Sequence, residues 1–145
     1  MTAIDETDIA AAQDSDRDAV IALWRASGLT RPWNDPVADF RQAVENSTSD
    51  ILLLHEAATL IATVMTGFDG HRGWVYYLAV HPDHRRKGLG KRMMAAAEAW
   101  LRARGAPKIQ LMVRSDNADV ITFYEALGLA RQDVVTLGRR FDRKG

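Results

Sequence analysis

Residues 78–91 read LAVHPDHRRKGLGK, a stretch in which an apolar run passes through a basic loop into an amphipathic segment. The aromatic and branched residues at 74–81 predict a buried strand, and Pro82 ends it because proline cannot donate to a sheet ladder. From Leu89 onward apolar residues recur at helical spacing, which predicts a helix that begins inside the stretch. A strand, a basic loop with glycines and a helix in this order predict an anion-binding site.

The chemistry of this site follows from the start of the predicted helix. The first turn of a helix has unpaired N–H groups and the positive end of the helix dipole, and glycine lets a ligand approach the backbone closely. The residues that we expect to hold a pyrophosphate group here are Arg85, Arg86, Lys87, Gly88, Leu89, Gly90 and Lys91. The alternative is a glycine-softened helix start surrounded by solvated arginines.

Two common phosphate motifs do not fit the stretch. A P-loop needs a glycine where Arg85 stands and a serine or threonine where Arg92 follows Lys91. The dinucleotide fingerprint needs a third glycine at the position of Met93. The loop therefore belongs to neither class.

Strands and helices alternate along the rest of the chain. Asp35-Pro36 combines a helix-capping residue with a proline at the first helical position, which predicts a helix over 36–45. The remaining patterns predict strands at 8–13, 51–55, 60–68, 108–113 and 130–141, and helices from 15, over 89–104 and over 118–127. This order predicts an α+β (mixed α/β) fold in a single domain over 1–145.

Composition bounds the classes of function. The 145 residues contain 19 Lys plus Arg and 19 Asp plus Glu, so net charge gives no reason to expect a nucleic-acid or membrane partner. The chain has no cysteine, and His81 and His84 alone do not suggest a metal site, so we expect none. No apolar run approaches the roughly 20 residues of a membrane helix, and the acidic start does not read as a secretory signal, so a cytoplasmic location is expected.

The pattern Arg-x-x-Gly-x-Gly at 85–90, after a strand that ends Val-x-Pro at 80–82, resembles the pyrophosphate loop of the GNAT superfamily of acyl-CoA-dependent N-acetyltransferases. The resemblance extends to the order of elements along nearly the whole chain. It implies acetyl-CoA as cofactor and a central mixed, mostly antiparallel sheet, flanked by helices, whose strands 74–81 and 108–113 splay apart around the pantetheine arm. The segments RPWNDP at 31–36 and DGHRG at 69–73 resemble a YpeA-like bacterial subgroup.

The resemblance also implies roles for particular residues. Asn117 matches a position that often bonds the pantetheine, and Tyr124 matches a tyrosine near the thioester sulfur, which makes it the candidate general acid. The backbone N–H groups of Leu78, Ala79 and Val80 are candidates to stabilise the polarised carbonyl. No acidic residue occurs at 74–80, so no general base is assigned. Water, a tyrosine and a carboxylate from elsewhere in the chain are the alternatives, and an amine that arrives unprotonated needs no base.

The acceptor is predicted from the loop at 31–36. Trp33, Asp35 and Pro36 are explained by the start of a helix, whereas Arg31 and Asn34 are left for a ligand, and arginine binds carboxylates well. We therefore expect a primary amine of an amino-acid-like metabolite, in a site to which Arg31, Trp33, Asn34, His71 and Tyr77 contribute. The alternatives are a protein lysine or N-terminus as acceptor, and an acyl-CoA-binding module without catalysis. By analogy the chain is a monomer or a homodimer.

Overall fold

The computed structural model describes residues 8–142, which form two compact units divided after Met112. The first unit consists of β1 Ile9–Ala11, α1 Arg17–Ala26, α2 Pro36–Glu45, β2 Ser49–Glu56, β3 Thr59–Phe68, β4 Gly73–Val80, α3 Leu89–Ala103 and β5 Ile109–Leu111. The second unit contains α4, Ala118–Ala126. Among the described residues no helix combines the length and apolar character that crossing a bilayer requires.

The sheet of the first unit has the order β1-β2-β3-β4-β5. All neighbours are antiparallel except β4 and β5, so the predicted mixed, mostly antiparallel sheet is confirmed. The parallel pairing joins only Gly73–Val75 to Ile109–Leu111. Within the described chain, the edge of β4 that faces β5 therefore has no strand partner from Tyr76 to Val80.

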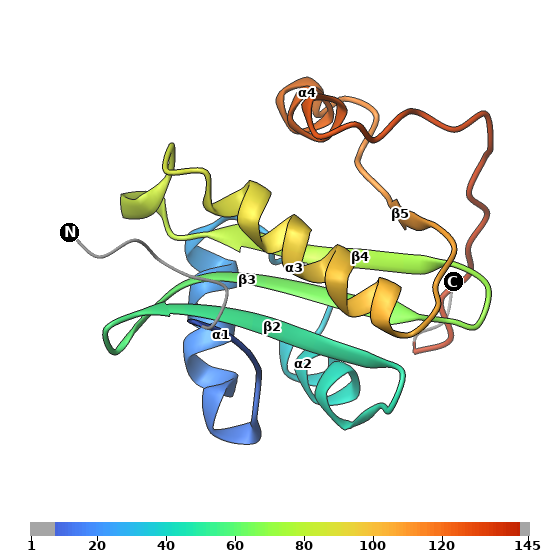
Figure 1. Cartoon of the computed structure of the whole chain (residues 1–145). Helices are drawn as coiled ribbons and strands as arrows, with labels where there is room; N and C mark the ends of the chain where they lie inside the picture. Colours follow the sequence, from blue (N-terminus) through green and yellow to red (C-terminus); the bar gives the residue numbers. More distant parts are fainter. Residues whose placement is uncertain (1–7, 143–145) are drawn as a thin grey trace. The chain divides into compact units, whose positions relative to one another are not determined.

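Helices cover both faces of this sheet (Figure 1). The helix α3 lies across one face and buries Met93 and Leu101, while α1 and α2 pack on the other. Trp24 of α1 and Phe40 of α2 are buried there in a core with residues of β2 and β3. Burial of these apolar faces is the main stabilising contribution to the unit.

The start of α2 agrees with its sequence signal. The Asp35 carboxylate accepts hydrogen bonds from the backbone N–H groups of Val37 at 3.0 Å and Ala38 at 3.3 Å. Pro36 occupies the first helical position, where its missing N–H costs no hydrogen bond. The helix begins at the predicted residue because both signals are local.

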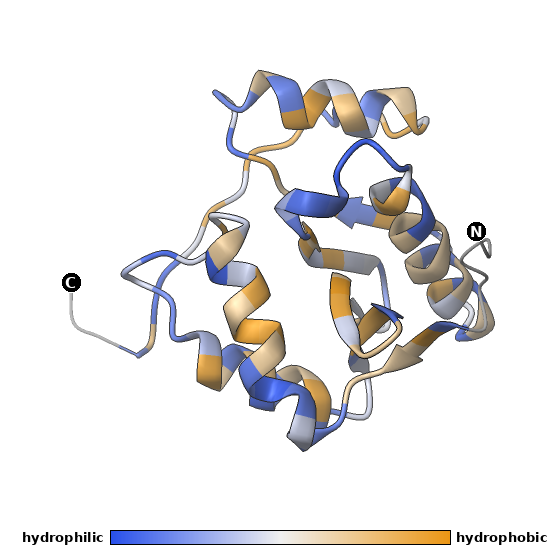
Figure 2. Cartoon of the chain, turned by 90° about the vertical axis from the view of Figure 1, so that its left-hand side faces the viewer, coloured by the Kyte–Doolittle hydropathy of each residue, from blue (hydrophilic) through white to orange (hydrophobic). Residues whose placement is uncertain are grey.

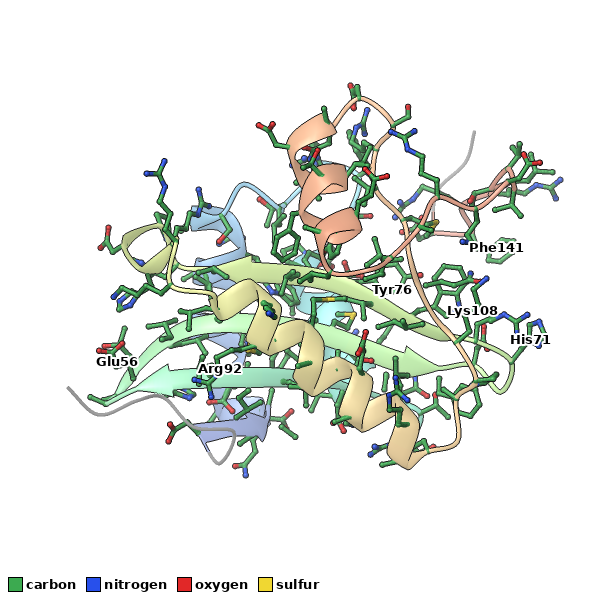
Figure 3. The ribbon with its side chains drawn as sticks, turned by 45° about the horizontal axis from the view of Figure 1, so that its top comes forward. Glu56, His71, Tyr76, Arg92, Lys108 and Phe141 are labelled. Atoms are coloured by element: carbon green, nitrogen blue, oxygen red, sulfur yellow. The ribbon has the colours of Figure 1, made fainter. Side chains whose placement is uncertain are left out.

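The prediction of closing strands over 130–141 is wrong. The described residues that follow α4 contain no strand. The side chains of Val134, Leu137 and Phe141 are 76%, 91% and 94% exposed, and Figure 3 shows Phe141 pointing into solvent. An extended segment without a paired neighbour or a buried face has nothing to stabilise it as a strand.

Close packing at the start of β4 gives a first testable prediction. A Cβ at the buried Gly73 would lie 2.6 Å from Cδ1 and 2.7 Å from Cδ2 of Leu101 on α3. We expect Gly73→Ala to lower the free energy of unfolding by about 1–3 kcal/mol, as overpacked cores do. Urea denaturation measures this. The matched control is Gly138→Ala, where a Cβ meets nothing within 4 Å, and equal stability of the two variants would contradict the prediction.

Candidate active site

The loop between β4 and α3 is hydrophilic along nearly its whole length (Figure 2). It contains a 3₁₀ turn at Pro82–His84, after which Arg85, Arg86 and Lys87 are exposed. Three exposed cationic side chains therefore lie immediately before α3, and Lys87 Nζ is 3.4 Å from His84 Nδ1. Such an arrangement attracts an anionic group to the start of the helix.

Gly88 forms the N-cap of α3 and is left-handed, with φ +74°. It has no side chain to cap the first turn, so the first N–H groups of α3 remain available to an anion. A Cβ at this position would meet nothing within 4 Å, which shows that the approach to the backbone is open. The structure thus places the predicted loop residues where a pyrophosphate fits.

A β-bulge interrupts β4 within the segment that β5 leaves unpaired. Tyr76 is paired with Met65 and Ala79 with Thr63, so Tyr77 and Leu78 together oppose a single residue of β3. Tyr77 accordingly has a φ of +51°, a conformation that non-glycine residues rarely adopt. Adjacent residues of a regular strand point to opposite faces, but this bulge brings the neighbours Tyr76 and Tyr77 to the same cavity.

Three interactions hold Tyr77 in this conformation. Its ring stacks on Trp24 with centroids 3.9 Å apart, and its carbonyl accepts a hydrogen bond from Thr63 Oγ1 at 3.1 Å. Trp24 Nε1 in turn donates to Thr63 Oγ1 at 3.2 Å. At the far end of the ring, the Tyr77 hydroxyl donates to Asp39 Oδ2 at 2.6 Å. Burial, together with the hydrogen bond to Asp39, holds the pKa of Tyr77 far above its usual value, so the hydroxyl stays protonated.

The cavity beside the two tyrosines has a volume of about 530 Å³. One face of α2 supplies part of its wall through residues spaced i, i+3 and i+4, and the residue that follows the helix adds to it. The cavity is lined by Leu29, Asn34, Asp39, Gln42, Ala43, Asn46, Ser49, Met65, Thr66, Gly67, Tyr76 and Tyr77. Among these described residues, Asp39 alone has a charged side chain. Pockets of this size and mixed polarity are typical of small-molecule sites.

Of the residues predicted for the acceptor, Asn34 and Tyr77 line this cavity. Arg31, Trp33 and His71 do not belong to its wall. Arg31 Nη1 instead donates to the carbonyl oxygens of Gly28 at 2.8 Å and Thr30 at 2.9 Å, in the loop that follows α1.

His71 lies in the turn between β3 and β4, at the end of the sheet opposite to Glu56 (Figure 3). Its side chain is exposed, and the residue that organises this turn is Asp69. The Asp69 carboxylate accepts hydrogen bonds from the N–H groups of Arg72 and His71 and from Trp74 Nε1. These hydrogen bonds hold the pKa of Asp69 below its usual value, and the bond from the Arg72 N–H has the largest effect. The Asp-Gly pair at 69–70 was the available signal, because aspartate commonly bonds the backbone two residues on.

Asn117 and Tyr124 belong to the second unit and lie at the start and in the last turns of α4. The Asn117 side chain accepts a hydrogen bond from the Val120 N–H at 3.4 Å, so it caps the helix. Tyr124 packs edge-to-face against Phe123 with ring centroids 5.0 Å apart. Burial raises the pKa of Tyr124 to about 12. The predicted contacts of both residues with the cofactor remain predictions.

The model of the acetyltransferase (GNAT) family matches residues 14–129. The chain belongs to the GNAT acetyltransferase family. It is 43% identical over 128 residues to an acetyltransferase of Yersinia pestis (strain Pestoides F), which covers 88% of this chain and 91% of that protein. An acetyltransferase of Pectobacterium atrosepticum is 44% identical with the same coverage. The predicted family is thus confirmed, whereas the YpeA-like subgroup stays a prediction.

Solved structures of other GNAT proteins share the fold. The aminoglycoside N-acetyltransferase AAC(6')-Iy, in complex with the bisubstrate analogue CoA-S-monomethyl-acetylneamine, superposes with a TM-score of 0.79 at 15% identity over 96% of this chain and 99% of that chain. A ribosomal-protein-alanine N-acetyltransferase from Brucella melitensis biovar Abortus gives 0.75 at 22% identity, over 97% and 100%. Acetyl-CoA is the cofactor of the family, as predicted, and the start of α3 fits its pyrophosphate.

Proposed function

We propose that this GNAT protein transfers the acetyl group of acetyl-CoA to the primary amine of a small molecule. The observation that carries the proposal is the cavity of about 530 Å³, which contains one carboxylate, Asp39, and adjoins the bulged strand β4. Next to that strand, the loop at 85–91 supplies the positive charge and open helix start that a pyrophosphate requires. A cofactor site and an acceptor cavity thus share one strand.

The backbone of β4 is suited to bind the thioester. The His81 N–H donates to the carbonyl of Ile61 on β3 at 2.8 Å. Because successive N–H groups of a strand alternate between its two edges, those of Val80 and Leu78 are expected to face the edge that β5 leaves unpaired. Donors fixed in a site that excludes water stabilise the developing charge on a carbonyl oxygen strongly.

The reaction transfers one acetyl group from sulfur to nitrogen and removes two protons from the acceptor ammonium. When bound, acetyl-CoA would supply an acetyl thioester, to whose carbonyl carbon the amine nitrogen adds directly before the carbon–sulfur bond breaks. The leaving thiolate takes one proton, for which Tyr124 is the proposed donor. The acceptor nitrogen releases one proton as the ammonium becomes a neutral amine, before the bond to carbon forms, and a second proton after it. One of these protons restores the tyrosine, and the other passes to solvent.

The acceptor predicted from Arg31 is an amino-acid-like metabolite, because a guanidinium can bind a carboxylate through two hydrogen bonds. Arg31 already donates to two carbonyl oxygens, and the charge in the cavity wall is negative. We therefore include amines without a carboxylate in the proposal. A protein amine, at an N-terminus or on a lysine, is the second candidate, because the Brucella protein of the same fold is named a ribosomal-protein-alanine N-acetyltransferase.

The test is release of thiol from acetyl-CoA by the purified protein, with amines, amino acids, polyamines, aminoglycosides and short peptides as acceptors. Calorimetry follows binding of acetyl-CoA in parallel. Turnover of a small amine supports the proposal, and turnover of peptides alone assigns a protein acceptor instead. Binding of acetyl-CoA without any turnover supports a binding module, and absence of binding contradicts the proposal altogether.

A further inference from the structure

We propose that Asp39 and Tyr77 form an ammonium-binding pair, through which the cavity selects amines whose ammonium group has no carboxylate beside it. The inference rests on the proposed function and names the acceptor class of that site. It starts from two side chains that lie 38 positions apart in the sequence and meet at 2.6 Å.

The Asp39 carboxylate has capacity left for a ligand. An ionised carboxylate offers about four lone-pair sites, and the Tyr77 hydroxyl uses one of them. Asp39 is partly buried in the wall of the cavity, where a charge-assisted hydrogen bond is stronger than at a fully exposed surface. A primary ammonium, which has three N–H donors, is a suitable partner for the remaining sites.

The charge of the cavity wall decides between classes of amine. The other described residues that line it are neutral, and among them Asn34, Gln42 and Asn46 provide polar groups without charge. An acceptor with a carboxylate next to its amine would place that carboxylate close to Asp39, with no cationic side chain in the wall to offset the repulsion. The wall therefore favours a plain amine over the corresponding amino acid.

The pair is held in place before any ligand binds. Tyr77 is fixed by its stacking on Trp24 and by the hydrogen bond from Thr63 to its carbonyl. Its raised pKa keeps the hydroxyl a donor to Asp39, so the carboxylate retains one orientation. Binding then costs little ordering of the site, which is the condition for a selective contact.

The experiment compares amines with the amino acids from which they differ by one carboxylate, namely tyramine with tyrosine and histamine with histidine. Calorimetry measures binding to the protein in the presence of CoA, and thiol release measures kcat and KM. We expect each amine to bind more tightly than its amino acid. Asp39→Asn, which keeps an oxygen for the Tyr77 hydroxyl, is expected to weaken amine binding about 10- to 100-fold, since hydrogen bonds to charged groups have this strength.

Controls separate this role from a structural one. Glu45→Gln removes one negative charge from the exposed end of α2, outside the cavity wall, and is expected to bind amines as the unaltered protein does. The unaltered protein, Asp39→Asn and Glu45→Gln should bind acetyl-CoA with equal affinity, because neither substitution touches the segment 85–91. Tyr77→Phe keeps the stacking ring and removes the donor, so it should weaken amine binding less than Asp39→Asn does.

The outcomes distinguish this inference from the proposed function. Amine binding that depends on Asp39, without release of thiol, would support the pair and contradict acetyl transfer. Thiol release from an acceptor whose KM is the same in Asp39→Asn would support acetyl transfer and overturn the pair. The pair is also overturned if neither amine binds more tightly than its amino acid.

Discussion

Replacing Tyr124 with phenylalanine is expected to lower kcat about 100-fold or more while acetyl-CoA binds as before, because positioned acid catalysis contributes about 100- to 10,000-fold. The leaving thiolate needs a proton, and the phenol of Tyr124 is the proposed source. Phenylalanine preserves the ring that packs against Phe123 and removes only the hydroxyl. Steady-state kinetics and calorimetry with acetyl-CoA measure the two quantities.

The pH dependence follows from the pKa of the same group. An unperturbed tyrosine loses its proton near pH 10, whereas burial raises the pKa of Tyr124 to about 12. A raised pKa extends the range in which the acid is protonated, so loss of this proton should not lower kcat until the pH approaches 12. We therefore measure kcat from pH 7 to pH 10.5 in the unaltered protein and in Tyr124→Phe. Any decline of kcat in this range should occur in both proteins, because Tyr124 stays protonated throughout it.

The control for Tyr124 is Phe123→Leu, which removes the edge-to-face ring contact and leaves the hydroxyl. A fall in kcat limited to the Tyr124 variant separates proton transfer from packing within α4. If Tyr124→Phe turned over acetyl-CoA as fast as the unaltered protein, the role of Tyr124 as the acid would have to be abandoned.

Features with a local cause could be predicted from the sequence. The start of α2 follows from Asp35 and Pro36, which act within one turn, and the start of α3 from Gly88, which adopts the left-handed conformation that glycine tolerates. Runs of branched and aromatic residues likewise located β3 and β4, because such residues pack well on a buried sheet. In each case the signal and its structural consequence lie within a few residues.

The candidate acceptor site depends on contacts between distant residues. Alternation along β4 predicts opposite faces for Tyr76 and Tyr77. No glycine or proline stands at the position of the bulge that brings them together. Asp39 lies in a helix where a polar residue is ordinarily solvated, and its importance appears only when Tyr77 meets it. The sequence shows no acidic residue at 74–80 and leaves a carboxylate from elsewhere as one alternative, but nothing in it indicates that α2 supplies this carboxylate.

Replacing Trp24 with alanine is expected to lower the free energy of unfolding by about 3–5 kcal/mol, the usual cost of truncating a buried tryptophan. The side chain is fully buried, stacks on Tyr77 and donates to Thr63. Its loss leaves a cavity in the core, removes the ring on which Tyr77 stacks, and removes the donor that orients the Thr63 hydroxyl bonded to the Tyr77 carbonyl. Urea denaturation monitored by circular dichroism measures the change.

The same residue connects stability to the acceptor site. Trp24→Phe retains a ring for Tyr77 to stack on but leaves the Thr63 hydroxyl without its donor, so it should cost less stability than Trp24→Ala. Trp33→Ala is the matched control, because Trp33 is 41% exposed and surface changes usually alter stability by about 0.5 kcal/mol or less. If Trp24→Ala and Trp33→Ala unfolded at the same urea concentration, the stacked pair would not be a support of the fold, and the orientation of Tyr77 toward Asp39 would need another cause.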